Sequence, residues 1–314
     1  MQRVVITGAT GSIGVALIEQ LLEHDIQVVA VVRKDSMRKK NIPAHVNVKI
    51  VELNLDRIKE LPEILKQYGI GTCDVFYHFG WDGTFGNSRN NVQGQLKNIR
   101  YTLDAAEVAA QIGCKKFIGA GSQAEYGRVD GIKLDALTPA FPENGYGMAK
   151  LCAGQMSRLL CEQLNIQHIW TRILSVYGPY DGDNTLIMSV IRKLLKNEEP
   201  LLTPGEQQWD YLYSKDAGLA MYLLGKNGLH GKTYCIGSGN VKTIREYVEI
   251  LKENIETSAE VGWGGIPYSE KQVMYLCANI NALCNDTGFE PRYSFEQGIK
   301  ETIEWYKEQN NEEN

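Results

Sequence analysis

The residues with the clearest chemical potential are a tyrosine and a lysine four positions apart, with a serine upstream. Tyr146 and Lys150 stand where a helix is predicted to begin, and Ser122 follows a predicted strand. A tyrosine hydroxyl, with its usual pKa of about 10, is a poor base at neutral pH. A lysine one helical turn away lies on the same face, and its charge can lower that pKa. Together the three side chains predict an acid–base site in which Ser122 binds a reacting oxygen and Tyr146 exchanges a proton with it.

A glycine-rich turn near the N-terminus indicates a partner for this chemistry. Gly8, Gly11 and Gly14 are spaced three apart between an expected strand and an expected helix. Gly8 permits the tight turn, Gly11 lets backbone N–H groups approach a pyrophosphate, and Gly14 lets the helix pack close to the sheet. The spacing predicts a dinucleotide site, to which the intervening Ser12 and Ile13 also belong. Lys150 is then expected to hold the nicotinamide ribose while a hydride moves to or from the nicotinamide.

The second expected strand ends in a basic residue. An acidic residue usually stands there when the 2′-hydroxyl of NAD must be held, whereas this chain has Arg33, followed by a basic cluster at 38–40. A guanidinium suits the 2′-phosphate of NADP, so the sequence favours NADP over NAD. The alternative is a solvated basic loop. Asn54 and Leu55, after the third expected strand, are predicted to touch the adenine.

Alternating strands and helices would position these groups. Short apolar runs predict strands at 4–6, 28–32, 48–51, 75–79, 117–120 and 169–173, and helical spacing predicts helices at 13–23, 58–68, 92–112 and 146–165. This order predicts an α/β fold with a Rossmann-type doubly wound parallel sheet. Shorter elements follow, with helices expected at 184–197, 214–225, 243–254 and 294–308. We expect an NAD(P)-binding Rossmann domain over 1–178 and, over 179–314, mainly a smaller substrate-binding lobe, parts of which can return to the sheet. The acidic end, 308–314, is expected to fray.

Composition excludes several classes of protein. A net charge of −5 offers no general basic face for nucleic acid. The seven cysteines form no CxxC pair, which fits reduced thiols in the cytoplasm better than disulfides or zinc. The five histidines show neither metal-ligand spacing nor a hydrolase context, so no metal site is expected. The start shows no secretory signal, and no apolar run reaches the roughly 18 residues of a membrane span.

These motifs together resemble the extended short-chain dehydrogenase/reductase family, in its nucleotide-sugar epimerase, dehydratase and reductase branch. The matching segments are Gly8–Gly14, Phe79-Gly80-Trp81, Asn91–Gly94, Ser122, Tyr146 with Lys150, Arg172–Pro179, Trp209–Tyr213 and Thr287–Ile299. The resemblance implies that Phe79, Gly80 and Trp81 lie at the cofactor. It also implies a homodimer formed through the two helices that begin near Asn91 and Tyr146.

Departures from the family pattern bear on the reaction. Gln123 and Ala124 stand where the 4,6-dehydratases place an acidic pair, so the residues that eliminate water are missing, and Glu125 is interpreted as a structural or substrate-contacting residue. Ser175 replaces an asparagine that usually touches the sugar diphosphate, and Trp209 replaces an arginine often aimed at the phosphates. Gln123, Ser175 and Trp209 are the candidate substrate residues. Trp209 can equally be a core residue.

The resemblance therefore implies an NAD(P)-dependent cytoplasmic oxidoreductase acting on a nucleotide-diphosphate sugar. Without the dehydratase pair, and with Arg33 present, reduction of the C4 keto group of a 4-keto-6-deoxy nucleotide sugar by NADPH is favoured. One alternative is a nucleotide-sugar 4-epimerase with tightly bound NAD, which would use the same three residues. A second is a regulator that senses NADP without catalysis. The sugar and the nucleotide remain open at this point.

Overall fold

A seven-stranded parallel sheet forms the centre of the protein. The computed structural model describes residues 1–312, and side chains as far as Asn310. The strands are ordered β11-β6-β5-β4-β1-β2-β3. Their bounds are β1 Arg3–Thr7, β2 Gln27–Val32, β3 Val48–Glu52, β4 Val75–His78, β5 Lys116–Ser122, β6 Gln167–Ile173 and β11 Thr233–Ile236. The order reverses beside β1, and the predicted Rossmann-type fold is confirmed.

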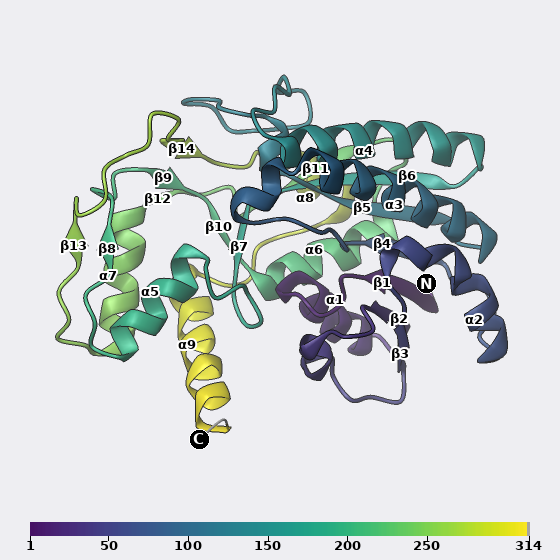
Figure 1. Cartoon of the computed structure of the whole chain (residues 1–314), viewed down its shortest axis with the longest axis horizontal. Helices are drawn as coiled ribbons and strands as arrows, with labels where there is room; N and C mark the ends of the chain where they lie inside the picture. The colour runs from purple at the N-terminus through teal and green to yellow at the C-terminus, as the bar shows by residue number, and fades with distance from the viewer. Residues whose placement is uncertain (313–314) are drawn as a thin grey trace.

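Helices cover both faces of this sheet, as Figure 1 shows. They are α1 (Ser12–Leu22), α2 (Leu61–Gln67), α3 (Val92–Gln111), α4 (Gly145–Gln163), α6 (Ser214–Asn227) and α8 (Asn281–Thr287). Val4 and Ile6 of β1 pack into a core shared with α1 and α6, whereas Val5 packs into the opposite core with α2 and α3. Successive side chains of a strand point to opposite faces, so an apolar run without polar alternation must be covered on both sides.

The second lobe is built from short strands and three helices. The strands form the pairs β7 (Ser175–Tyr177) with β10 (Tyr211–Tyr213) and β8 (Leu201–Leu202) with β13 (Gly262–Trp263), and the triplet β12 (Lys242–Thr243), β9 (Gln208–Trp209), β14 (Tyr275–Leu276). The helices are α5 (Leu186–Leu195), α7 (Ile244–Ile255) and α9 (Phe295–Glu312). Tyr177, Val248 and Ile299 belong to its separate apolar core.

The chain after residue 178 divides between the two parts. Strand β11 pairs with β6 in the central sheet, and α6 packs along α1. Short 3₁₀ helices, which the apolar pattern does not mark, lie at η1 (Met37–Asn41), η2 (Leu55–Glu60), η3 (Gly86–Asn90) and η4 (Gln123–Glu125). Helix α9 continues to Glu312, beyond the helix end expected at residue 308, and 313–314 lie outside the described residues. No helix within residues 1–312 is both long and apolar enough to cross a membrane.

Candidate active site

The glycine-rich turn lies between β1 and α1, against the end of β4. Gly8 has a φ of +71°, and a Cβ there would lie 2.7 Å from the backbone nitrogen of Gly80. A Cβ on Gly14 would lie 2.7 Å from the Gly8 carbonyl oxygen. These two glycines are therefore required by the backbone itself. A Cβ on Gly11 would meet only the Gly8 oxygen, at 3.7 Å, so nothing in the protein fills the space that Gly11 leaves.

The surroundings of this turn fit a dinucleotide. A cavity of about 330 Å³, here called the loop cavity, is lined by Gly8, Gly11, Arg33, Leu55, Phe79, Gly80 and Trp81 among others. The buried hydroxyl of Ser12 has no hydrogen-bond partner among the described residues, and Ser12 opens helix α1. A free hydroxyl and free N–H groups at a helix N-terminus suit a phosphate. Ser12 and Ile13 line a second cavity beside the first, so the predicted cofactor loop is well shaped for a pyrophosphate.

The polar residues at the outer end of the loop cavity are placed differently from one another. The Arg33 side chain is 70% exposed and lies 3.8 Å from the Asp82 carboxylate. Arg38 also lines the cavity, and its guanidinium donates to the Tyr180 carbonyl oxygen. Asn54 is exposed and its side-chain oxygen accepts from the Lys34 backbone nitrogen at 3.2 Å. Leu55, not Asn54, therefore lines the cavity.

The start of α4 brings the tyrosine to the serine. Asn144 caps this helix, its side-chain oxygen accepting from the Gly147 nitrogen at 2.8 Å. A Cβ on Gly147 would lie 2.2 Å from the Ala124 carbonyl oxygen, so the first turn of α4 packs directly on η4. Ser122, at the end of β5, and Tyr146 share a hydrogen bond. Both line a cavity of about 330 Å³ together with Lys150, Gly11 and Trp81, here called the tyrosine cavity.

Lys150 is buried beside the same strand. Its Nζ donates to the Ala120 carbonyl oxygen at 2.5 Å and lies 3.7 Å from the centre of the Trp81 ring. Burial lowers the pKa of Lys150 to about 7, although the Glu125 carboxylate opposes this shift. The indole of Trp81 also meets the Tyr146 ring edge-on, at 6.1 Å between centroids. Trp81 is thus a wall of the site shared by the lysine and the tyrosine, a role that its sequence position does not indicate.

The Tyr146 hydroxyl does not behave as the sequence predicts. Burial raises its pKa, and the hydrogen bond with Ser122 and the charge of Arg89 oppose that shift. The Arg89 guanidinium lies 4.6 Å from the centre of the tyrosine ring. The pKa of Tyr146 is therefore raised and not lowered as expected, because the cost of burying its phenolate outweighs the opposing effects of Ser122 and Arg89. At neutral pH, Tyr146 is protonated.

A larger cavity of about 510 Å³, here called the lobe cavity, adjoins the tyrosine cavity. Leu174, Val176 and Asp181 line both. Ser175 and Trp209 line the lobe cavity, where the Trp209 indole nitrogen donates to the Ser175 hydroxyl at 2.8 Å. Among the described residues that line this cavity, none is Lys, Arg or His. Burial raises the pKa of the Asp181 carboxyl to about 6, a feature that no sequence motif announces.

The two remaining candidates near Ser122 fall outside the cavities. Gln123 lies in η4, is half-buried and lines neither the tyrosine cavity nor the lobe cavity. Glu125 is fully buried in the same turn and pairs with Arg172 at 2.9 Å. Of the two interpretations of Glu125, structural or substrate-contacting, this burial favours the structural one. The turn is a 3₁₀ helix and not extended chain, which is why the carboxylate points inward.

Comparison with known proteins identifies the family of this chain. The family model described as NAD dependent epimerase/dehydratase family matches residues 4–237. The dTDP-4-dehydro-6-deoxyglucose reductase of Escherichia coli is 27% identical, over 96% of each chain. The solved structure of a UDP-N-acetylglucosamine 4-epimerase from Methanobrevibacter ruminantium, in complex with UDP-N-acetylmuramic acid, superposes with a TM-score of 0.86 at 23% identity, covering 98% of this chain and 99% of that one.

A dTDP-glucose 4,6-dehydratase from Bacillus anthracis in complex with NAD superposes with a TM-score of 0.83 at 21% identity, covering 99% of this chain and 98% of the other. At such identities the two structures establish the fold alone. The resemblance that the motifs predict is confirmed by the family model, which spans most of the chain. The relatives catalyse reduction, epimerisation and dehydration, so they do not select one reaction. The chain belongs to the NAD dependent epimerase/dehydratase family.

Proposed function

We propose that this protein reduces the C4 keto group of a 4-keto-6-deoxy nucleotide-diphosphate sugar with NADPH. The observation that carries the proposal is a protonated Tyr146 hydrogen-bonded to Ser122 in one cavity with Lys150. Reduction of a ketone needs a general acid for the developing alkoxide, whereas oxidation of an alcohol needs a base. The residues that a dehydratase would use are absent, since Gln123 and Ala124 carry no carboxylate.

Each side chain has a defined part in this reaction. Ser122 hydrogen-bonds the keto oxygen, and the Tyr146 hydroxyl donates its proton to that oxygen as the C4–H bond forms. Lys150 holds the nicotinamide ribose, and the face of Trp81 keeps the ammonium in place. A reduced nicotinamide supplies the hydride when it is bound. The apolar walls of the tyrosine cavity, which include Ile173 and Leu174, exclude water from the reacting carbon.

The cofactor proposed is NADP. Gly8, Gly11, Ser12, Ile13 and Gly14 would hold the pyrophosphate, and Leu55 the adenine side. The mostly exposed Arg33 is free to turn from Asp82 to a 2′-phosphate, since their 3.8 Å separation makes a weak pair. Asp82 would repel that phosphate unless Arg33 stays between them. The NAD in the dehydratase structure belongs to that protein and leaves the preference to be measured.

The substrate is proposed to span two cavities. Its sugar would lie in the tyrosine cavity and its nucleotide in the lobe cavity. The two cavities adjoin, because the apolar side chains of Leu174 and Val176 line both. The lobe cavity belongs mainly to the part of the chain after residue 178, which we propose as the substrate-binding lobe. Trp209 supplies a face on which a base or a sugar can stack, fixed by its bond to Ser175.

We also propose a homodimer formed through α3 and α4. Both helices expose large apolar side chains away from the sheet, including Val92, Leu96, Met148, Met156 and Leu159, of which each is at least 46% exposed. Apolar side chains gathered on two neighbouring helices are typical of an interface between subunits.

A panel of 4-keto-6-deoxy sugars carrying UDP, dTDP, CDP or GDP tests the function. We expect NADPH consumption with at least one of them, and a single alcohol product epimer. Tyr146→Phe is expected to lower turnover about 10²-fold or more, as for loss of a general acid, with NADPH binding retained. Lys300→Met, at an exposed site on α9, serves as a matched control that should keep full turnover.

Two results would contradict this assignment. The first is tightly bound NAD in the purified protein, together with interconversion of two nucleotide sugars without net use of NADPH, which would establish a 4-epimerase. The second is NADPH binding with no turnover of any sugar in the panel and a biological effect that Tyr146→Phe leaves intact, which would establish a sensor of NADP.

A further inference from the structure

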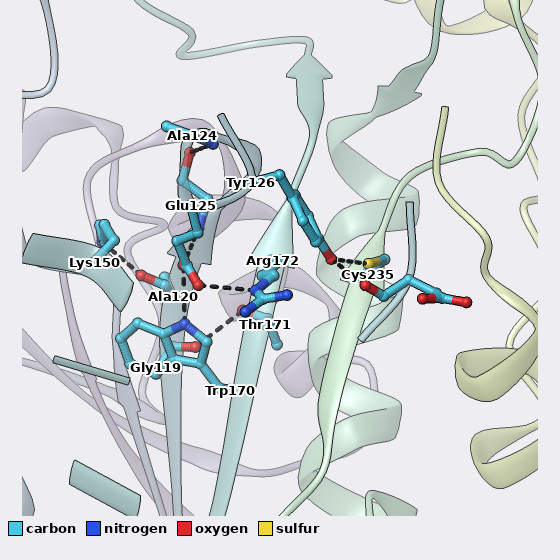
Figure 2. A network of polar contacts seen from close by, with 12 residues as sticks. Gly119, Ala120, Ala124, Glu125, Tyr126, Lys150, Trp170, Thr171, Arg172 and Cys235 are labelled. Carbon is cyan, nitrogen blue, oxygen red and sulfur yellow. Dashed lines mark hydrogen bonds and ion pairs between the residues drawn. The ribbon is translucent and has the colours of Figure 1, made fainter. Parts of the chain in front are cut away.

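A buried carboxylate lies directly behind the candidate active site. Glu125 is fully buried in the turn that follows β5. One of its oxygens accepts from the Ser122 backbone nitrogen at 2.8 Å and from the Trp170 indole nitrogen at 3.0 Å, and the other accepts from Arg172 Nε at 2.9 Å. Figure 2 shows Lys150 on the other side of the same strand end, bound to the Ala120 carbonyl. The carboxylate therefore links the backbone at Ser122 to Trp170 and Arg172 of β6, beside the strand end that binds Lys150.

The backbone around this carboxylate is shaped to admit it. A Cβ on Gly121 would lie 2.3 Å from both the Glu125 oxygen and the Trp170 indole nitrogen. Cβ atoms on Gly119 and Gly154 would lie 2.2 Å and 2.7 Å from atoms of the same indole ring. Three glycines from β5 and α4 thus leave room for the indole that donates to Glu125. The carboxylate is a built feature of the site and not a side chain that happens to be buried.

Stability alone does not account for the arrangement. A buried ion pair such as Glu125 with Arg172 is weak evidence for stability, because both ions lose their hydration. The Nη1 atom of Arg172 is buried without a hydrogen-bond partner among the described residues. An apolar pair of the same size would avoid both costs. Such an apolar pair would not place a negative charge next to the strand that carries Ser122.

The charge acts on the lysine of the site. The contacts of Lys150 are the Ala120 carbonyl and the faces of Trp81 and Tyr146, none of which carries a full negative charge. Glu125 is the carboxylate that raises the pKa of Lys150 against the larger effect of burial.

The other charged or titratable groups around the lysine do not supply a negative charge of this kind. His78, at the end of β4, is neutral, because burial lowers its pKa to about 3. Arg89, on η3, faces the ring of Tyr146 and is itself positive. Asp181, from the loop after β7, lines the same cavity but is shifted toward its neutral form. The Tyr146 hydroxyl is protonated.

We propose that Glu125 is a positioning residue of this site: its hydrogen bond fixes the turn that carries Ser122, and its negative charge favours the ammonium form of the buried Lys150. The importance of Ser122 and Lys150 rests on the proposed function, but the effect of Glu125 on them does not. The effect can be measured in the protein without substrate or cofactor, so it fails or holds independently of the reaction.

The experiment is a pH titration of Lys150 by NMR. Lysine labelled with ¹³C at Cε reports the charge of each amine, and the Lys150 signal is assigned by its loss in Lys150→Met. Glu125→Gln keeps the side-chain shape but leaves Arg172 buried without a counterion, so it can unfold. The double variant Glu125→Gln/Arg172→Met removes both charges and keeps the packing. Lys116→Met, at the far end of β5, is the control, because its buried amine bonds three carbonyls outside the site.

The expected midpoint for Lys150 is about 7 in the wild-type protein. It should fall in the double variant, because the charge that opposes the effect of burial is removed. The glutamine oxygen can still accept from the Ser122 nitrogen, so a second double variant, Glu125→Leu/Arg172→Met, removes that acceptor. In it the amide hydrogen of Ser122 should exchange faster with solvent, as the turn loosens. Lys116→Met should change neither. A folded double variant with the wild-type midpoint would overturn the proposal, and would leave Glu125 as a residue of the fold alone.

Discussion

Substituting Gly11 by alanine separates cofactor binding from folding at the glycine-rich turn. Gly11 has a φ of −85° and a ψ of 167°, an extended conformation that alanine adopts without strain. Its added Cβ would meet only the Gly8 oxygen, at 3.7 Å, which is an ordinary contact. No atom of the protein would therefore clash with a methyl group at this position. The added methyl group would instead clash with a ligand bound in the loop and tyrosine cavities, both of which Gly11 lines.

The magnitudes follow from this geometry. Replacing Gly by Ala at a compatible position gains about 0.4–1 kcal/mol through the unfolded chain, and the poorer N-cap offsets a similar amount, so the free energy of unfolding should change by less than about 1 kcal/mol. A phosphate oxygen bound by an N–H of the turn lies about 2.9 Å from that nitrogen, in the space that the methyl group takes. We expect a loss of tenfold or more in affinity for the dinucleotide, about 1.4 kcal/mol.

Gly14→Ala is the matched control, because it should show the reverse pattern. Its Cβ would lie 2.7 Å from the Gly8 oxygen and 2.8 Å from Ala9 Cα, so backbone must move. Forcing such a contact typically costs about 1–3 kcal/mol of stability. The assay is calorimetric titration with NADPH and NADH beside urea unfolding of each variant. Wild-type affinity in a folded Gly11→Ala protein would refute the placing of the pyrophosphate at this turn.

Three further outcomes are expected. Arg33→Ala should weaken NADPH binding about tenfold in calorimetry and leave NADH binding unchanged, as for loss of one exposed phosphate contact. His168→Gln should lessen unfolding by acid in urea titrations. Burial lowers the pKa of His168 to about 3, so between pH 6.5 and 3 the unfolded chain binds this proton and the folded chain does not. The free energy of unfolding therefore falls as the pH falls, by about 3 kcal/mol at pH 4. Leu159→Glu, on the exposed face of α4, should yield a monomer by light scattering if α3 and α4 form the dimer; an unchanged mass would argue against that interface.

The cofactor half of the site could be predicted from the sequence because it depends on backbone. Gly8 and Gly14 are fixed by close approach between main-chain atoms, and such positions accept almost no other residue. The strands beneath them are buried on both faces, so their apolar runs are unbroken. The helix that carries Tyr146 is likewise set locally, by the Asn144 cap and the small Gly147. Each of these features leaves a glycine, a cap or an apolar run that can be recognised in the sequence, even where the contact that requires it lies far along the chain.

The substrate half depends on contacts between distant segments, which spacing cannot predict. Trp209 and Ser175 meet across two short strands of different sheets, so neither residue shows its partner in the sequence. Lys150 is predicted correctly as part of the site, but its charge depends on burial under Trp81 and on Glu125. The net direction of the Tyr146 pKa shift differs from the prediction for a related reason, because burial of the tyrosine outweighs the neighbouring charges. Protonation depends on the assembled surroundings and not on the residue type.

The lobe cavity sets a condition that the substrate must meet. A diphosphate carries two or more negative charges, and a pocket without Lys, Arg or His offers it only hydrogen bonds and the N-terminal end of α5. Asp181 tolerates an anion there only in its neutral form, which burial favours below a pH of about 6. A nucleotide sugar would therefore bind more tightly at acid pH than at alkaline pH, whereas affinity for NADPH, which we propose is held at the far end of the site by Arg33, need not follow. The two dependences together distinguish a diphosphate in the lobe cavity from one held elsewhere on the protein.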